Sequence, residues 1–332
     1  MDTRLDKKQT IERWGIRFTG IVQGVGFRPL VSLLAHQLGI NGFVYNDSSG
    51  VYVEAQSDTD TLQLFVDTIQ EEQPRLCRIT HVGITKVAPH DVDDNTEFVI
   101  SKSPLEGTVN TFISADTSPC EECLSEMNEK GRRYHYPFIN CTNCGPRYSI
   151  IKSMPYDRER TTMSDFTMCE ACHDEYVDVN GRRYHAEPNA CEQCGPSYQL
   201  LDNNGNLCVV DDCFEAAREM IAKGAIIALK GIGGYHLVCD ATNDTAVQTL
   251  RDRKHRKDKP FAIMAGSIDI VEEFAVVSDG DLDALSSMAR PIVLLKKNDD
   301  FHTSISELVA PNNHLIGVML PYAPIHHVLV PH

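Results

Sequence analysis

The sequence predicts an α+β protein of several domains, and three observations support this prediction. Residues 15–101 alternate between apolar runs with strand spacing and amphipathic stretches with helical spacing. Eight of the twelve cysteines form four Cys-x-x-Cys pairs, inside a segment that repeats at an offset of 50 residues. Residues 201–332 again mix apolar runs with helical stretches. The 332 residues and 42% hydrophobic content are sufficient for two or three packed domains.

The first domain is expected over residues 13–102. Its pattern predicts strands at 15–22, 42–46, 50–56, 78–88 and 96–101, and helices at 29–39 and 59–70. Pro29 is expected at the first helical position, and one face should carry Leu30, Leu33, Leu34 and Leu38. The order β-α-β-β-α-β is that of a ferredoxin-like α/β sandwich. A linker is expected at 101–110, where a proline and a glycine interrupt the pattern.

The cysteine pairs predict a zinc module over residues 110–200. The segments 131–151 and 181–201 are identical at ten of 21 positions, which indicates a duplication. In each copy, 17 or 18 residues separate two Cys-x-x-Cys pairs, and two such pairs supply four thiolates for one tetrahedral zinc ion. We therefore expect two structural zinc sites, with the ligand sets Cys120, Cys123, Cys141, Cys144 and Cys169, Cys172, Cys191, Cys194.

Other residues of the module allow a variation on this scheme. His135 and His185 recur with the repeat, and either one is an alternative to a thiolate ligand. The glycines after Cys144 and Cys194 are expected to adopt positive φ. The remaining cysteines are expected to be small buried hydrophobes; they are Cys77, Cys208, Cys213 and Cys239.

Charge and hydropathy limit the class of partner. The formal net charge of −16 argues against nucleic-acid and anionic-membrane binding, because both need a broad basic surface. No apolar run is long enough to cross a bilayer, and the first 15 residues lack the apolar core of a secretion signal. The sequence therefore predicts a cytoplasmic protein, in which thiols stay reduced.

A glycine-rich loop joins the first expected strand to the first expected helix. The loop is formed by Gln23, Gly24, Val25, Gly26, Phe27 and Arg28. Its two glycines allow consecutive N–H groups to converge, and the N-terminus of the following helix adds partial positive charge. Because an arginine can hold phosphate oxygens through two N–H groups, Arg28 makes this loop a candidate phosphate site. The alternative is a glycine-rich turn with a surface arginine.

The third domain is expected over residues 201–332, with helices at 211–224 and 278–289. A buried strand is expected at 225–231, and further apolar runs at 261–264, 291–297 and 315–321 predict a mixed sheet. Six basic residues lie between Arg251 and Lys259. They form either a solvated surface or a site for phosphate groups.

The stretches "GIVQGVGFRPLV" and "GFVYNDSSG" resemble the two signatures of the acylphosphatase family. The resemblance covers residues 13–102. It implies that Arg28 and the loop amides hold the phosphate of an acyl phosphate, while Asn46 positions the hydrolytic water. An asparagine suits this role, because the phosphate itself can accept the proton and no strong base is needed.

The stretches "ALKGIGGYHLVCDATN" and "KPFAIM", which flank the basic segment, resemble the YrdC/Sua5 family of carbamoyl-adenylate-forming domains. In that family a Lys-x-Arg motif binds the triphosphate, and Lys254 and Arg256 occupy those positions. The family's nucleotide motif would fall beyond His332, so this domain is expected to be truncated on its C-terminal side.

The order of the three units resembles the HypF carbamoyltransferases of nickel-iron hydrogenase maturation. This resemblance implies that carbamoyl phosphate is hydrolysed to carbamate, which ATP with magnesium converts to carbamoyl adenylate. The carbamoyl group then passes to the C-terminal cysteine of HypE, as precursor of the cyanide ligands. Two alternatives remain: a non-catalytic zinc-binding adaptor, and a YrdC/Sua5-like enzyme of transfer-RNA modification.

Overall fold

The computed structural model describes residues 10–89, 97–104, 111–299, 301 and 305–330. The chain divides into two compact units, of which one comprises Met1–Asp116 and Asn140–Gly195 and the other Thr117–Ile139 and Pro196–His332. Part of the predicted linker, residues 105–110, lies outside the described residues. The domain boundaries that we expect from the sequence stay predictions.

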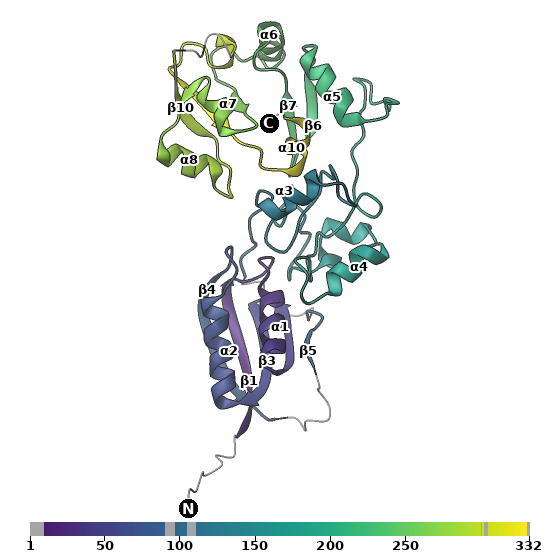
Figure 1. The fold of residues 1–332 in the computed structure, drawn as a ribbon, viewed down its shortest axis with the longest axis vertical. Helices are drawn as coiled ribbons and strands as arrows, with labels where there is room; N and C mark the ends of the chain where they lie inside the picture. The colour runs from purple at the N-terminus through teal and green to yellow at the C-terminus, as the bar shows by residue number, and fades with distance from the viewer. Residues whose placement is uncertain (1–9, 90–96, 105–110, 300, 302–304, 331–332) are drawn as a thin grey trace, which may run out of the picture. The chain divides into compact units, whose positions relative to one another are not determined.

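The first unit contains the predicted sandwich, with five strands in one sheet in the order β4-β1-β3-β2-β5. Strand β1 is antiparallel to β3 and β4, while β2 is antiparallel to β3 and parallel to β5. Helices α1 and α2 lie on one face of this sheet (Figure 1). The elements are β1 Ile11–Ile21, α1 Phe27–Gln37, β2 Asn41–Asp47, β3 Gly50–Asp58, α2 Thr59–Glu71, β4 Arg78–Val87 and β5 Phe98–Ile100. The predicted strand and helix order is confirmed.

Helix α1 begins earlier than the sequence predicts, which changes its buried face. Gly26 is the N-cap residue, so Pro29 is the third helical residue and not the first. Leu34 is buried, and Leu30 and Leu38 pack against the core, as predicted. The residues that were missed are Phe27, Val31 and Ala35, which are fully buried, whereas Leu33 is only half-buried. The earlier start places Arg28 in the first turn of the helix.

Residues 140–195 belong to the same unit and consist mainly of loops. They include helix α4, Glu170–Val177, and two 3-10 turns at Arg158–Arg160 and Thr162–Asp165. Arg158 holds these loops together by donating to the backbone carbonyls of Glu187 (2.5 Å), Asn189 (2.9 Å) and Phe166 (2.7 Å). Side chain to backbone bonds of this kind take the place of a sheet or a large apolar core.

The second unit contains a mixed sheet, as predicted, in the order β8-β11-β10-β9. Strands β11 and β8 are parallel, and the other pairs are antiparallel. The elements of this unit are α3 Glu121–Asn128, α5 Cys213–Ala222, β6 Ile227–Lys230, β7 Tyr235–Val238, α6 Asp244–Arg253, β8 Ala262–Met264, α7 Ile268–Glu272, β9 Ala275–Val276, α8 Asp279–Ser286, β10 Val293–Lys297, η4 Glu307–Val309, β11 Leu315–Met319 and α10 Pro324–Leu329.

Two burial predictions are wrong. Among the described residues, the strand expected at 225–231 pairs with β7 alone, and its residues alternate between half-buried and exposed. A strand outside the main sheet has no second layer to bury both of its faces. Of the four single cysteines, Cys77 is buried, whereas Cys208, Cys213 and Cys239 are half-buried.

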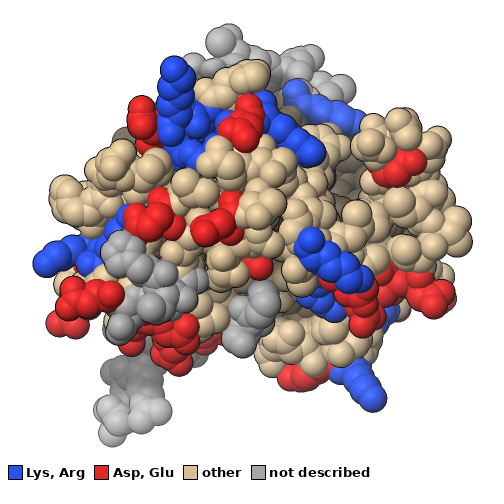
Figure 2. All heavy atoms as spheres, turned by 90° about the horizontal axis from the view of Figure 1, so that it is seen from above, with Lys and Arg blue, Asp and Glu red and all other residues tan. Residues whose placement is uncertain are grey.

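Figure 2 shows one face of the molecule, on which acidic and basic side chains are interspersed among uncharged residues. None of the helices in the described ranges has the length and apolar character needed to cross a bilayer.

Candidate active site and cysteine clusters

The glycine-rich loop between β1 and α1 has the backbone conformation that the sequence predicts. Gly24 and Gly26 have φ angles of 70° and 79°, in the left-handed region that favours glycine. Within the described part of the chain, the backbone N–H groups of residues 24–28 have no hydrogen-bond acceptor. Five successive donors at the N-terminus of an eleven-residue helix form a site suited to an anion.

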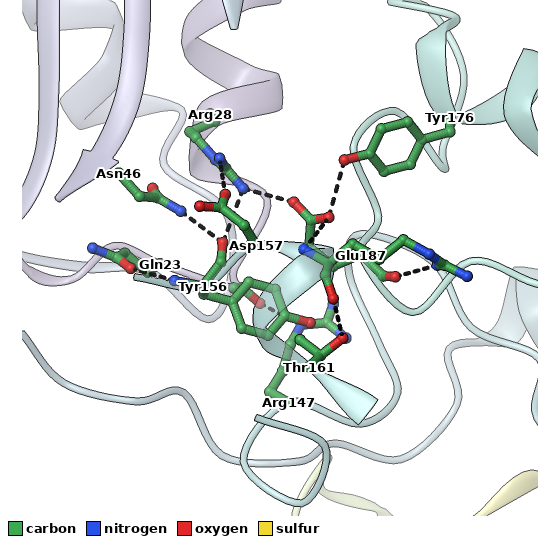
Figure 3. Close-up of polar contacts among 11 residues, drawn as sticks. Gln23, Arg28, Asn46, Arg147, Tyr156, Asp157, Thr161, Tyr176 and Glu187 are labelled. Atoms are coloured by element: carbon green, nitrogen blue, oxygen red, sulfur yellow. Dashed lines mark hydrogen bonds and ion pairs between the residues drawn. The ribbon is translucent and has the colours of Figure 1, made fainter. Parts of the chain in front are cut away.

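Arg28 and Asn46 lie together at this loop, as the resemblance implies. Both line a cavity of about 20 Å³, together with Gly24, Gly26 and Phe27 of the loop, and both are buried. The Asn46 side chain donates from Nδ2 to the backbone carbonyl of Tyr156 at 2.9 Å (Figure 3). Its Oδ1 atom is buried and accepts no hydrogen bond from any described residue. The amide is therefore fixed in orientation and retains one free acceptor at the cavity.

Gln23 connects the loop to the neighbouring segments. Its Nε2 atom donates to the backbone carbonyls of Asp47 and Gly50, both at 2.7 Å, and its Oε1 atom accepts from the Tyr156 N–H at 3.0 Å. Gln23 is thus a structural residue of the loop with all three contacts internal to the protein. Its side chain therefore links the start of the loop to the backbone of Tyr156 and to the turn between Asp47 and Gly50.

The sequence analysis missed three residues that contact Arg28. Its Nη1 atom donates to Asp157 Oδ1 at 2.6 Å, and its Nη2 atom donates to Glu187 Oε1 at 2.7 Å and to the Tyr156 carbonyl at 3.1 Å (Figure 3). All three lie more than 100 residues from Arg28 in the sequence. One signal was available: Glu187 stands where the first repeat has Pro137.

Burial and charge shift several pKa values at the site. Burial acts to lower the pKa of Arg28, but the carboxylates of Asp157 and Glu187 outweigh it and the pKa is raised. Burial raises the pKa of Glu187, against the opposing effect of Arg28. Burial, together with the charge of Arg28, lowers the pKa of His185 to about 4. His185 also lines the cavity, and it is neutral at pH 7.

Arg147 connects the glycine loop to the first Cys-x-x-Cys turn of unit one. Its Nε atom donates to the Gly24 carbonyl, and its Nη atoms donate to the carbonyls of Cys141 (3.0 Å), Thr142 (2.9 Å), Cys144 (3.1 Å) and Pro146 (2.8 Å). The side chain is almost fully buried. One guanidinium therefore fixes the carbonyl of Gly24 and the backbone around two cysteines.

The eight paired cysteines form the two predicted groups of four. In each group, the four sulfur atoms lie within 4.8 Å of one another. The Cys141 and Cys144 sulfur atoms are 3.7 Å apart, and three sulfur separations within the second group are 3.6 to 3.8 Å. A tetrahedron with metal to sulfur bonds of about 2.3 Å has edges of about 3.8 Å, so both groups fit zinc. Burial acts to raise the pKa of Cys194, but backbone N–H donors outweigh it and lower the pKa to about 7, which favours the thiolate.

The details of the repeat differ in part from the predictions. Gly145 has a φ of 97°, as expected, but Gly195 is not among the residues with positive φ, so that part of the prediction is wrong. His135 and His185 belong to neither group of ligand atoms. Both instead have left-handed backbones, with φ of 54° and 48°, and their N–H groups donate to the carbonyls of Met127 and Tyr176. In both copies the recurring histidine therefore closes the turn after a helix.

The two predicted nucleotide-binding residues lie in the second unit. Lys254 and Arg256 both line a cavity of about 760 Å³. Arg256 donates to the Pro260 carbonyl at 3.2 Å, and its guanidinium lies 5.1 Å from the centre of the Phe261 ring. Arg251, from the same basic segment, is buried and donates to the carbonyls of Leu308 and Lys257. Arg251 is thus a structural residue, whereas Lys254 and Arg256 are placed at a cavity.

Three protein families match successive parts of the chain. The acylphosphatase family matches residues 14–100, and the HypF finger family matches residues 120–151 and 168–201. A family described as telomere recombination, which comprises Sua5, YciO and YrdC, matches residues 219–332. The three matches agree with the acylphosphatase-like, zinc-finger and YrdC-like units that the sequence predicts.

Single proteins match the chain over nearly its whole length. The carbamoyltransferase HypF of Rhodobacter capsulatus is 43% identical over 320 residues, or 96% of this chain and 42% of the relative. A crystal structure of full-length HypF in the phosphate- and nucleotide-bound form has 42% identity and a TM-score of 0.89, over 98% of this chain and 42% of that one. The chain belongs to the HypF family. It spans about two fifths of the length of these HypF relatives.

The acylphosphatase match also extends to single proteins. The acylphosphatase of Thermotoga petrophila is 35% identical over 82 residues, which is 24% of this chain and 90% of the relative. This chain therefore matches nearly the whole length of an acylphosphatase, and the loop, Arg28 and Asn46 lie within the matched residues.

Proposed function

We propose that the chain hydrolyses carbamoyl phosphate to carbamate and phosphate, as the first step of a carbamoyltransferase of hydrogenase maturation. The observation that supports this best is the cavity at the glycine loop. Arg28 and Asn46, whose Oδ1 is unbonded, line it, and so do residues of the loop whose five backbone N–H groups have no acceptor among the described residues. Carbamoyl is proposed as the acyl group because the relatives that match nearly the whole chain are named carbamoyltransferases.

Each of these groups has a role in the proposed reaction. The N–H groups of residues 24–28 and the Arg28 guanidinium hold the phosphoryl oxygens and neutralise their charge. Asn46 Oδ1 accepts a hydrogen bond from the attacking water and aims it at phosphorus. The water oxygen bonds to phosphorus, the bond from phosphorus to the carbamate oxygen breaks, and the water proton passes to a phosphoryl oxygen. Carbamate leaves as an anion, so no protein base is required.

The test is phosphate release from carbamoyl phosphate by the purified chain. Arg28→Ala is expected to weaken phosphate binding and to abolish most turnover, while Asn46→Ala should lower kcat by ~10²-fold with little change in KM. Arg75→Ala and Asn41→Ala are matched controls, because Arg75 is exposed and Asn41 lies at the other end of β2. Kinetics like those of the parent chain in the Asn46 variant would refute the mechanism.

The second unit is proposed to use the carbamate. Lys254 and Arg256 are placed at a large cavity, and the related full-length HypF structure holds phosphate and a nucleotide. We infer that these two cations bind the phosphates of ATP, brought with magnesium, when carbamoyl adenylate forms. In the complete architecture the carbamoyl group passes to a HypE-like acceptor. Binding of ATP that is weakened by Lys254→Ala, measured by titration calorimetry, tests the first of these roles.

The two cysteine groups are proposed to hold one structural zinc ion each. Zinc bound by four thiolates supplies cross-links that stabilise the fold and leaves no position open for catalysis. The adaptor alternative leaves the cavity at the glycine loop without a role, and absence of phosphate release would favour it. A transfer-RNA enzyme is an alternative for the second unit alone, and RNA binding would favour it. The cytoplasmic location stays a prediction.

A further inference from the structure

Arg28 is held by groups that lie outside the acylphosphatase match. The match ends at residue 100, whereas the acceptors of Arg28 come from residues 156, 157 and 187. The two carboxylates differ in burial: the Glu187 side chain is 2% exposed and the Asp157 side chain 23%. Glu187 is therefore the fully desolvated partner of a buried guanidinium, the kind of ion pair whose loss is most costly.

Glu187 is itself fixed on its far side. Its Oε2 atom accepts from the Tyr176 hydroxyl at 2.9 Å and from the Arg158 N–H at 3.0 Å. The Glu187 carbonyl accepts from the Arg158 side chain at 2.5 Å. The carboxylate cannot rotate without losing these bonds, so it is a rigid acceptor for Arg28 and not a flexible counter-ion.

The contacts of Arg28 leave part of its hydrogen-bonding capacity for a ligand. A guanidinium has five N–H groups. Two on Nη2 and one on Nη1 are bonded to Glu187, Tyr156 and Asp157. Among the described residues, the Nε–H and the second Nη1–H have no acceptor. Arg28 is thus anchored at two nitrogens, and the two N–H groups that remain lie on different edges of the guanidinium, so each can donate singly to a phosphoryl oxygen.

We propose that Glu187 is a positioning residue of the hydrolytic site, which fixes the plane of the Arg28 guanidinium so that one of its unbonded N–H groups is held toward the phosphate. This inference rests on the proposed hydrolysis at the glycine loop. It means that the HypF finger segment supplies a part of the hydrolytic site. In the opposite arrangement, Glu187 competes with phosphate for Arg28. Removal of Glu187 would then tighten phosphate binding instead of weakening it.

The experiment measures binding of inorganic phosphate by calorimetry and hydrolysis of carbamoyl phosphate, with the full chain and three variants. Glu187→Ala is expected to raise the Kd for phosphate and lower kcat/KM by about 10- to 100-fold, because Arg28 loses its main anchor. Glu187→Gln keeps an oxygen for Arg28 but loses the charge and the acceptor for the Arg158 N–H, so it should recover only part of both losses. Glu159→Ala removes an exposed acid from the neighbouring turn and should match the parent chain.

The binding constant separates positioning from a merely structural role. If Glu187 only supports folding, its removal lowers the fraction of active protein and the apparent kcat, while Kd and KM of the folded fraction stay unchanged. Unchanged or tighter phosphate binding by Glu187→Ala would overturn the inference, as would equal losses in Glu187→Ala and Glu187→Gln. If the parent chain neither binds phosphate nor releases it, the proposed hydrolysis itself fails.

Discussion

Replacement of Arg147 by alanine is expected to destabilise the loops of residues 140–161 severely. The side chain is 2% exposed and donates to five backbone carbonyls, one in the glycine loop and four around Cys141 and Cys144. At about 1 kcal/mol net for each hydrogen bond, with some carbonyls recovering water, the loss is about 4 kcal/mol. We expect it to appear as local opening, because all five acceptors lie in the glycine loop or between Cys141 and Pro146.

Hydrogen exchange followed by mass spectrometry measures this effect peptide by peptide. A loss of about 4 kcal/mol corresponds to protection factors about 10³-fold lower in peptides from 140–161. Arg160→Ala is the matched control: Arg160 lies in the same segment but donates to a single carbonyl, that of Met154 at 2.5 Å, so about 1 kcal/mol should be lost. An Arg147 variant no more exposed to exchange than the Arg160 variant would refute the reasoning.

Three further predictions concern other parts of the chain. Metal analysis should find two zinc ions per chain. A strong chelator should increase hydrogen exchange in residues 120–194 before the fluorescence of Trp14, the single tryptophan, changes. Simultaneous changes in exchange and fluorescence would contradict this prediction. Burial, with the nearby histidines, lowers the pKa of His326 to about 3, so the unfolded chain gains a proton first as pH falls below about 6.5, and about 2 kcal/mol of stability should be lost by pH 5. His326→Asn should flatten this dependence in urea titrations, and an unchanged slope would count against it. Gly42→Ala should lower the free energy of unfolding, followed by Trp14 fluorescence, by about 3 kcal/mol or more, because its Cβ would lie 1.9 Å from the Glu54 carbonyl oxygen. Gly39→Ala, whose Cβ would meet open space, should lower it by about 1 kcal/mol. Equal losses in the two variants would exclude this explanation.

Local patterns in the sequence predicted most of the fold. The alternation in residues 50–56 and the helical spacing in 59–70 are set by which side chains face one core, so the corresponding elements match closely. The predicted start of α1 was wrong because a proline is acceptable anywhere in the first turn of a helix, and the left-handed backbone of Gly26 determined the N-cap. The burial of the strand at 227–230 was predicted wrongly, because an apolar run does not reveal whether one or both of its faces will be covered.

The candidate site could be predicted only in part. Gly24, Gly26, Arg28 and Asn46 lie in two short motifs whose residue types match their chemistry. The acids that bind Arg28 could not be found in this way. Asp157 lies 129 positions and Glu187 159 positions from Arg28, and contacts at such separations follow no periodic pattern in the sequence. Such contacts are fixed by the packing of loops, which depends on the whole unit.

The left-handed histidine turns have a consequence for how the duplicated segment diversified. His135 and His185 have nearly the same φ and bond their backbones in the same way, so the two copies have kept one template for their turns. Two positions further on, the template carries Pro137 in one copy and Glu187 in the other. The histidines that maintain the shared turns are thus separate from this position, which is one of the eleven that differ between the copies. In such a duplication, one copy can acquire a side chain with a new role while both copies retain the backbone turns that maintain the fold.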